Sequence, residues 1–455
     1  MFQAEICRTL VFTLTVVSIC LCCISSFSSS TDIRSDIPVL TGRIVAVGIP
    51  GAGAVSGVGY FHPGGPICDK PTFRSLTRPG AVLDPDRILV ASSSNFGAPM
   101  GNSGESSGAV LSIDPRSDRA LVIPPTFAVD GTQASCQDGR IILFTANSPA
   151  FLNRVHNPEA ATSASPSLTA PTGISVNNAF GRIWITSMPF GPTGIGNHSV
   201  LDPDGCPLAQ APDKVAGGVF VGELTNRTPQ LAKGAMRTGA IGTALLGKSP
   251  DGSGRAVFAG LSADGSIVQV HVEQGVDGLA PPRTIRALTL TARISRAGMV
   301  LNWVPNMILF VADPAANSIV ALSLRANGKL FYVENIQRLT GAWFNLPVDL
   351  APAVPETASS LFSSNTTLAG GSDIYVANRG NGTITRIKQD GTVVAIRKIT
   401  LPGITELGRD QLNGVAVSSD ARYIWITISR GVAGFPDGEL IEVPAFGASS
   451  SDFRN

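Results

Sequence analysis

Short apolar stretches recur along the chain, and each follows a turn and ends in a small or polar residue. Their length and the Gly, Pro and Asp residues that bound them predict short β-strands rather than helices. Seven copies align, at residues 86–93, 139–146, 181–188, 254–261, 306–314, 373–379 and 422–428. An internal repeat of this kind predicts a fold assembled from one repeated unit.

Further apolar stretches surround these copies. Six copies have a second one upstream, at residues 79–83, 171–176, 241–246, 297–302, 346–351 and 412–417, whereas the copy at Arg140 has only a doubtful partner near Ala134. Several copies also have a third stretch after them, at residues 108–113, 266–272, 317–324, 382–387 and 438–443. Turn, strand, turn, strand, loop, strand is the order of a β-propeller blade.

A small meander cannot bury both of its faces alone, and closing a ring of meanders removes exposed sheet edges. The repeat therefore predicts an all-β chain with a single β-propeller over residues 41–446. Seven blades are favoured, and six are the alternative if the copy at Arg140 is an insertion. Residues 41–47 are predicted to complete the last blade by pairing with residues 440–443.

Composition narrows the function classes. The 49 Gly and 32 Pro residues are spread along the chain and leave little room for long helices. The 34 basic and 33 acidic residues give a formal net charge of +1, so no electrostatic argument supports nucleic acid or an anionic membrane as a partner.

The first residues predict a targeting segment, because Arg8 precedes an apolar run over residues 10–24 and a small-residue stretch over residues 25–30. We expect a signal peptide over residues 1–29, a linker over 30–40, a tail over 447–455 and a secreted protein that is not held in the membrane after cleavage. A signal anchor or a place in the cell envelope is the alternative.

Secretion would permit two modifications. Of Cys68, Cys136 and Cys206, which remain after cleavage, two are expected to form a disulfide, and the pairing is open. Asn197, Asn226, Asn365 and Asn381 stand in glycosylation triplets, although the triplets at Asn197 and Asn381 also suit plain turns.

Two segments carry a family resemblance. Residues 372–387, SDIYVANRGNGTITRI, resemble the repeat of YVTN-type and NHL-type propellers, and residues 412–427, LNGVAVSSDARYIWIT, resemble a unit of SMP-30 (gluconolactonase-like) proteins. The resemblance implies the fold more strongly than a function, because these families include calcium-assisted lactonases, lyases and proteins that only bind partners.

Ligands of propellers generally lie at the central channel, and the repeat gives the equivalent strand ends. They are Ser92, Thr145, Ser187, Gly260, Asp313, Asn378 and Ile428. Asp313, Asn378 and Asn413 are candidate oxygen ligands for Ca²⁺, with Asp349 or Asn317 nearby.

The resemblance implies a metal ligand at Asn413, but the early acidic ligand of the lactonase pattern has no match in residues 31–100. The other interpretation of these Asp and Asn side chains is that they bond to nearby backbone in turns.

Two further features of the sequence have a possible functional meaning, namely a phosphate-loop string and a histidine in a Gly-rich stretch. Residues 242–249, GTALLGKS, match a phosphate-binding loop as a string, but Pro250 and Asp251 follow where a helix would have to begin. His62 lies in a Gly-rich stretch outside the repeat and is the His that we consider as an acid or base, with a packed loop as the alternative.

Two functions remain open. The favoured one is a monomeric scaffold that binds a small molecule, a glycan or a protein at a propeller face. The alternative is a calcium-assisted hydrolase, lactonase or lyase that acts on a small molecule in the channel. Long inserts at residues 96–107 and 156–168 could form a pocket under either hypothesis.

Overall fold

The computed structural model divides the chain into two compact units, Met1–Val39 and Leu40–Asn455. The structure describes residues 37–50, 52–59, 86–92, 109–113, 115, 120–122, 141–144, 170–177, 182–188, 218–223, 226–231, 240–248, 250–251, 256–262, 266–271, 283–287, 298–302, 306–328, 330–353, 373–402, 407, 411–418, 421–432 and 435–447. No helix within these ranges is long and apolar enough to cross a membrane.

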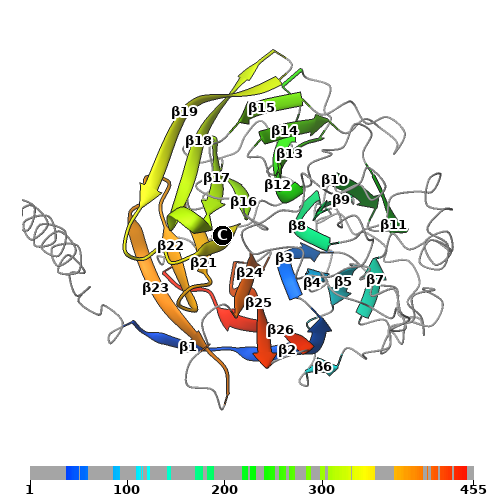
Figure 1. The fold of residues 1–455 in the computed structure, drawn as a ribbon, viewed down its shortest axis with the longest axis vertical. Coiled ribbons are helices and arrows are strands. Elements are labelled where there is room, and N and C mark those ends of the chain that lie inside the picture. Colours follow the sequence, from blue (N-terminus) through cyan, green and yellow to red (C-terminus); the bar gives the residue numbers. More distant parts are fainter. Residues whose placement is uncertain are drawn as a thin grey trace, which may run out of the picture. The chain divides into compact units, whose positions relative to one another are not determined.

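Four sheets contain four strands each, and every neighbouring pair in them is antiparallel (Figure 1). They are β3 (Ala52–Gly59), β4 (Asp86–Ser92), β5 (Ala109–Ile113) and β7 (Ile141–Phe144); β8 (Ala170–Asn177), β9 (Arg182–Met188), β10 (Gly218–Glu223) and β11 (Asn226–Leu231); β12 (Ala240–Lys248), β13 (Ala256–Ser262), β14 (Ser266–His271) and β15 (Arg283–Ala287); and β16 (Met299–Asn302), β17 (Ile308–Asp313), β18 (Ser318–Asn327) and β19 (Leu330–Thr340).

Two further sheets contain five strands each and include strands from the beginning of the described chain. One has the order β20 (Pro347–Pro352), β21 (Ile374–Asn378), β22 (Thr383–Ile387), β23 (Val393–Thr400) and β1 (Val39–Thr41), and the other has the order β24 (Leu412–Val417), β25 (Tyr423–Val432), β26 (Phe435–Pro444), β2 (Arg43–Pro50) and β6 (Leu121–Val122).

The first strands of the six sheets form a ring. β3 contacts β8, and contacts continue through β12, β16, β20 and β24 back to β3. The chain is therefore an all-β β-propeller, with the sheets arranged around the ring of inner strands (Figure 1).

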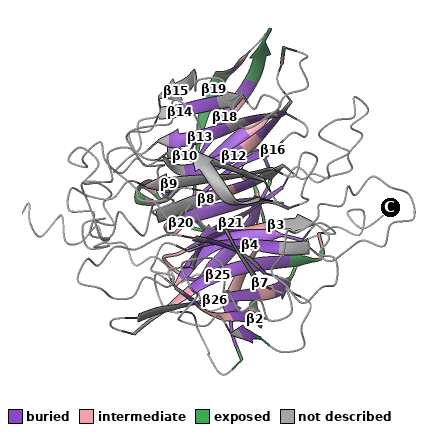
Figure 2. Ribbon diagram, turned by 90° about the vertical axis from the view of Figure 1, so that its right-hand side faces the viewer, coloured by how far each residue is buried: buried purple, intermediate pink, exposed green. Residues whose placement is uncertain are grey.

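The core consists of apolar layers between neighbouring sheets. One layer joins the β12–β15 and β16–β19 sheets, and others join β16–β19 to β20–β23 and β20–β23 to β24–β26. Strands β21 and β22 are buried along their whole length because both of their faces pack in this way. Figure 2 shows the described middle strands as mostly buried, whereas β19 carries an exposed stretch.

The ring closes as the sequence predicts. β2 pairs antiparallel with β26, and Arg43 lies opposite Glu442 and Ile44 opposite Ile441. The Trp425 indole donates a hydrogen bond to Oε2 of Glu442 at 3.1 Å, while Arg43 pairs with Oε1 of the same carboxylate. The expectation that this segment completes the last blade is confirmed for residues 43–47, whereas Thr41 lies in β1 of the neighbouring sheet.

Six of the seven aligned copies are the second strand of a sheet, in β4, β9, β13, β17, β21 and β25. The copy at Arg140 differs, because its strand β7 pairs with β5 as the fourth strand of the β3 sheet. The expected partner of β4 was also wrong: β4 pairs with β3, in the Gly-rich stretch that the alignment left outside the repeat. Residues 79–83 lie outside the described residues.

The segment after β26 packs onto the neighbouring β20–β23 sheet. The Tyr375 hydroxyl donates to the Phe446 carbonyl at 2.7 Å, and Arg386 donates to the same carbonyl at 3.1 Å while its Nε donates to Asp373 at 2.8 Å. Burial raises the pKa of the Tyr375 phenol above its usual value of 10.0. The contacts fasten the last described residues across the joint between two blades.

Candidate binding face

The inner strands share a backbone irregularity at the end where each begins. The pairing register shifts near the start of β3, β8, β12, β20 and β24, so one or more extra residues bulge out of each pairing. The first paired residue after the bulge is glycine in β8, β12 and β24, namely Gly173, Gly242 and Gly414. Gly298 takes the matching place before β16, and Asp349 takes it in β20.

Two of these glycines stand where neighbouring inner strands approach closely. A Cβ added to Gly298 would lie 2.4 Å from the Cα of Asp349, and one added to Gly414 would lie 2.6 Å from the carbonyl oxygen of Gly53. Atoms of neighbouring strands therefore fill the space where a side chain would stand at these two positions.

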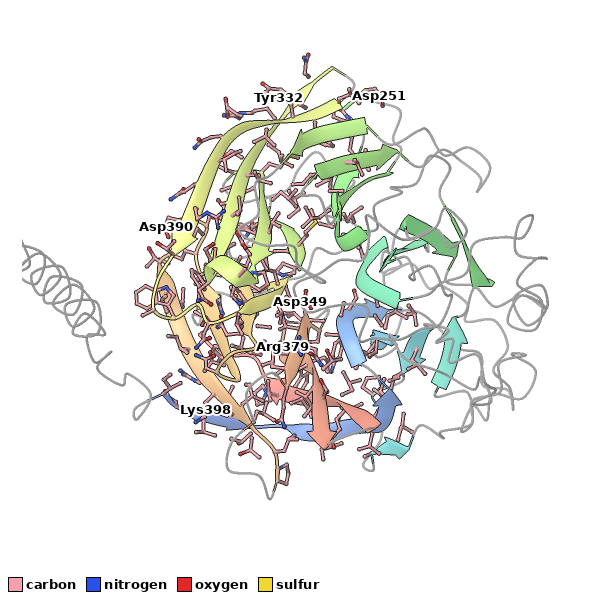
Figure 3. The ribbon with its side chains drawn as sticks, in the orientation of Figure 1. Asp251, Tyr332, Asp349, Arg379, Asp390 and Lys398 are labelled. Carbon is pink, nitrogen blue, oxygen red and sulfur yellow. The ribbon has the colours of Figure 1, made fainter. Side chains whose placement is uncertain are left out.

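Asp349 ties two inner strands together. Its Oδ1 accepts the N–H of Leu350 at 3.0 Å, and its Oδ2 accepts the N–H of Val415 in β24 at 3.0 Å. The residue is 7% exposed and lies near the middle of the ring (Figure 3). Both carboxylate oxygens thus satisfy buried backbone donors, one in the next residue and one in a neighbouring strand.

The three candidate calcium ligands take part in different sets of contacts. Oδ2 of Asp313, at the end of β17, accepts a hydrogen bond from Arg338 at 2.6 Å. Asn378, at the end of β21, donates to Thr385 Oγ1 at 2.9 Å, and Asn413 donates to Ser429 Oγ at 2.6 Å. All three side chains are buried.

The connection from β19 to β20, residues 341–346, is fixed by two asparagine side chains. The N–H of Asn345 donates to Oδ1 of Asn378 at 3.2 Å, and the N–H of Leu346 donates to Oδ1 of Asn317 at 2.7 Å. Leu346 has φ 49°, a left-handed conformation that costs a residue with a Cβ about 1–2 kcal/mol. The asparagine contact helps to hold this strained residue in place.

Further backbone contacts fasten the same connection to the β21–β22 turn. The N–H of Gly380 donates to the Asn345 carbonyl and that of Arg379 donates to the Leu346 carbonyl, both at 3.0 Å. Phe344 is 4% exposed and packs in the layer between the two sheets. The loop is therefore anchored on both sides before any ligand binds.

Trp343 is the large exposed side chain of this fixed loop, and the neighbouring Ala342 is exposed as well. It is 38% exposed, and its carbonyl accepts a hydrogen bond from Thr385 Oγ1 at 3.4 Å. Its indole packs against Gly341, since a Cβ on Gly341 would lie 2.4 Å from Nε1 and Cε2 of the ring. Sequence reasoning missed Trp343, because the residue lies outside the repeat; a Trp flanked by Gly341 and Asn345 in a blade connection was the available signal.

The other single-residue candidates include two groups. His62, Thr145, Cys68, Cys136, Cys206, Asn197 and Asn365 lie outside the described residues. Asn226 begins β11, and Oδ1 of Asn381 accepts a hydrogen bond from Thr383 Oγ1 at 2.8 Å in the turn after β21. Glycosylation of either stays a prediction.

The phosphate-loop string lies mostly in β12, which pairs with β13 and leads into a turn at Pro250 and Asp251. This confirms that the string lacks the required helix. Within the described ranges, no group of three or more His, Cys, Asp or Glu side chains could hold a metal ion.

No protein-family model and no curated protein sequence matches the chain. Among solved structures, it is similar to a chain of a nidogen/laminin complex, at 12% identity and a TM-score of 0.38 over 71% of this chain and 82% of that chain. It is also similar to regucalcin, a calcium-binding protein from Agrobacterium tumefaciens, at 13% identity and a TM-score of 0.37 over 90% of this chain and 97% of that chain. At these TM-scores neither structure bears on what this chain binds, and the fold rests on its own sheets.

Proposed function

We propose that the chain is a secreted, six-bladed β-propeller that binds a ligand or partner and performs no chemistry on it. The observation that supports this proposal most is the loop of residues 341–346, which holds Trp343 exposed on a backbone fixed by Asn317 and Asn378. A loop that is ordered before binding loses little conformational entropy on association. Trp is also the side chain that most often dominates binding energy at recognition surfaces.

The alternative, a calcium-assisted lactonase, needs several oxygen donors that converge on one ion. The described donors fit this requirement poorly. Asp349 uses both carboxylate oxygens on backbone N–H groups, and Asp313 is paired with Arg338. These contacts give the acidic side chains near the inner strands a role in holding the fold.

The experiment that separates the two functions is calorimetric unfolding of the purified chain in millimolar CaCl₂ and in EDTA, together with hydrolysis assays on a panel of lactones. We expect the same unfolding temperature in both solutions and no turnover. A ligand at about 100 times its Kd stabilises the folded state by about 2.7 kcal/mol, so a specific calcium site would be evident. Calcium stabilisation that disappears in Asn413→Ala, accompanied by lactone turnover, would overturn the proposal in favour of the enzyme.

A further inference from the structure

Three segments meet at the loop that carries Trp343, namely residues 314–317 (PAAN), 341–346 (GAWFNL) and 379–382 (RGNG), and we call them together the Trp343 face. Hydrogen bonds between the second segment and the other two bring them together. Arg379 is the one charged residue in their sequences, and each contributes an asparagine, namely Asn317, Asn345 and Asn381. The segments of the face therefore combine an exposed aromatic ring with three amide side chains and carry one charged side chain.

From this composition we propose that the Trp343 face binds a neutral saccharide, which deepens the proposed function and depends on it. A pyranose ring presents a flat face of C–H groups that stacks on an indole, and hydroxyls that both donate and accept hydrogen bonds. Side-chain amides also do both, and guanidinium groups donate. The exposed indole of Trp343 supplies the stacking surface. Oδ1 of Asn317 and Oδ1 of Asn381 already accept hydrogen bonds from Leu346 and Thr383, so these two side chains would serve hydroxyls as amide N–H donors.

The distribution of exposed apolar side chains favours a saccharide over a protein partner. A stable protein interface has an apolar, fully buried centre and covers about 800 Å² on each partner. Among the described residues the other large exposed hydrophobics lie in strands outside this face: Val39 in β1, Tyr332 and Ile336 in β19, Val394 in β23 and Tyr423 in β25. One aromatic ring among amides matches a sugar unit better than it matches a protein surface.

The stacking surface is also held in one orientation. The indole packs against Gly341, where a Cβ would lie 2.4 Å from Nε1, and the N–H of Phe344 donates to the Gly341 carbonyl at 3.1 Å to close the turn. Gly341→Ala must therefore displace the indole without removing it. This gives a second variant that tests the geometry of the surface as well as its chemistry.

The test is a binding screen of the full chain on immobilised neutral oligosaccharides, namely cellohexaose, chitohexaose, laminarihexaose, mannohexaose and xylohexaose, followed by calorimetric titration with any that bind. Stacking of a nucleobase on an aromatic side chain is worth roughly tenfold or more in affinity, and we expect an effect of the same order for a pyranose ring. We expect at least one probe to bind, Trp343→Ala to lose about tenfold or more, and Gly341→Ala to weaken binding. Trp343→Phe keeps an aromatic ring and should retain part of the affinity for the probe.

The matched control is Tyr423→Ala, which removes an aromatic side chain of similar exposure, 42%, from another strand; it should bind as the wild type does. Failure of all five probes to bind, or binding that Trp343→Ala leaves unchanged, overturns the saccharide assignment. Neither result bears on the calcium and lactone experiment, so failure of this inference is distinguishable from failure of the proposed function. Unfolding of each variant is measured in parallel, and only variants with wild-type stability enter the comparison.

Discussion

Replacing Asp349 tests whether the carboxylate at the ring is a structural tie or a metal ligand. In Asp349→Ala, the N–H groups of Leu350 and Val415 both lose their acceptor. Leu350 is 5% exposed and Val415 is 1% exposed, so water cannot readily replace the carboxylate. The change acts on a joint between β20 and β24 and leaves the apolar layers between the sheets intact.

The expected cost follows from these two bonds. A buried donor left without an acceptor costs about 1–3 kcal/mol, so Asp349→Ala should lower the free energy of unfolding by about 2–6 kcal/mol. Asp349→Asn keeps one oxygen acceptor and places an amide N–H₂ against the other donor. We therefore expect it to lower the free energy of unfolding by about 1–3 kcal/mol. Folded proteins have total stabilities of about 5–15 kcal/mol, and both effects are therefore measurable.

Urea unfolding, followed by fluorescence and circular dichroism in EDTA and in CaCl₂, measures these costs. Asp390→Asn is the matched control, because Oδ1 of Asp390 also accepts a backbone N–H, from Thr392 at 2.8 Å, but Asp390 is exposed. We expect it to cost at most about 0.5 kcal/mol. A cost below about 0.5 kcal/mol for Asp349→Ala, or a cost that appears only in calcium, would refute the structural role.

Two more predictions concern stability. Tyr375→Phe removes the hydroxyl that donates to Phe446, and it should lower the free energy of unfolding by about 1–3 kcal/mol in urea titrations at neutral pH. Burial raises the folded-state pKa of Tyr375 above 10.0. The stability that the neutral phenol contributes is therefore complete below about pH 10 and is lost as the pH rises through the folded-state pKa. The Tyr375→Phe variant should lack this part of the loss of stability at alkaline pH. Gly298→Ala should destabilise the chain by several kcal/mol in thermal unfolding, because its Cβ would contact the Asp349 backbone. The control is Gly328→Ala, where nothing lies within 4 Å of the added Cβ. It should cost only about 1–2 kcal/mol, because a residue with a Cβ must adopt a φ of 58° there.

The repeated part of the fold is readable from the sequence, because its strands are buried on both faces and therefore appear as continuous apolar runs. All seven aligned copies are strands in the structure, and six stand second in their sheets. The outer strands are harder to predict. β19 reads LFYVENIQRLT and is largely exposed, so it lacks the apolar run on which the alignment depends, and β3 was missed because AGAVSGVG is too rich in glycine.

The candidate site was less predictable than the fold. The strand-end positions of Asp313 and Asn378 follow from the repeat, but their hydrogen-bond partners do not. Arg338, which binds Asp313, lies 25 residues further along the chain, and Val415, which binds Asp349, lies 66 residues further. Contacts of this kind depend on how the blades stack, so the sequence could not decide between a metal ligand and a structural acceptor.

The distinction between repeated and unrepeated residues bears on our proposal that binding takes place at the Trp343 face. At the ring, three inner strands have a glycine after the bulge, Gly298 precedes a fourth, and β20 has Asp349, whose oxygens bind backbone of its own and the next strand. At Gly298 and Gly414 the backbone of the neighbouring strand occupies the space that a side chain would need, so these two positions offer no side chain to a ligand. The connections between blades carry no such constraint, and residues 341–346 combine an exposed Trp343 with a left-handed Leu346 whose N–H is held by Asn317. Strain that is kept at an exposed, anchored loop is expected where recognition requires a fixed geometry, and for this reason we assign binding to the Trp343 face rather than to the ring.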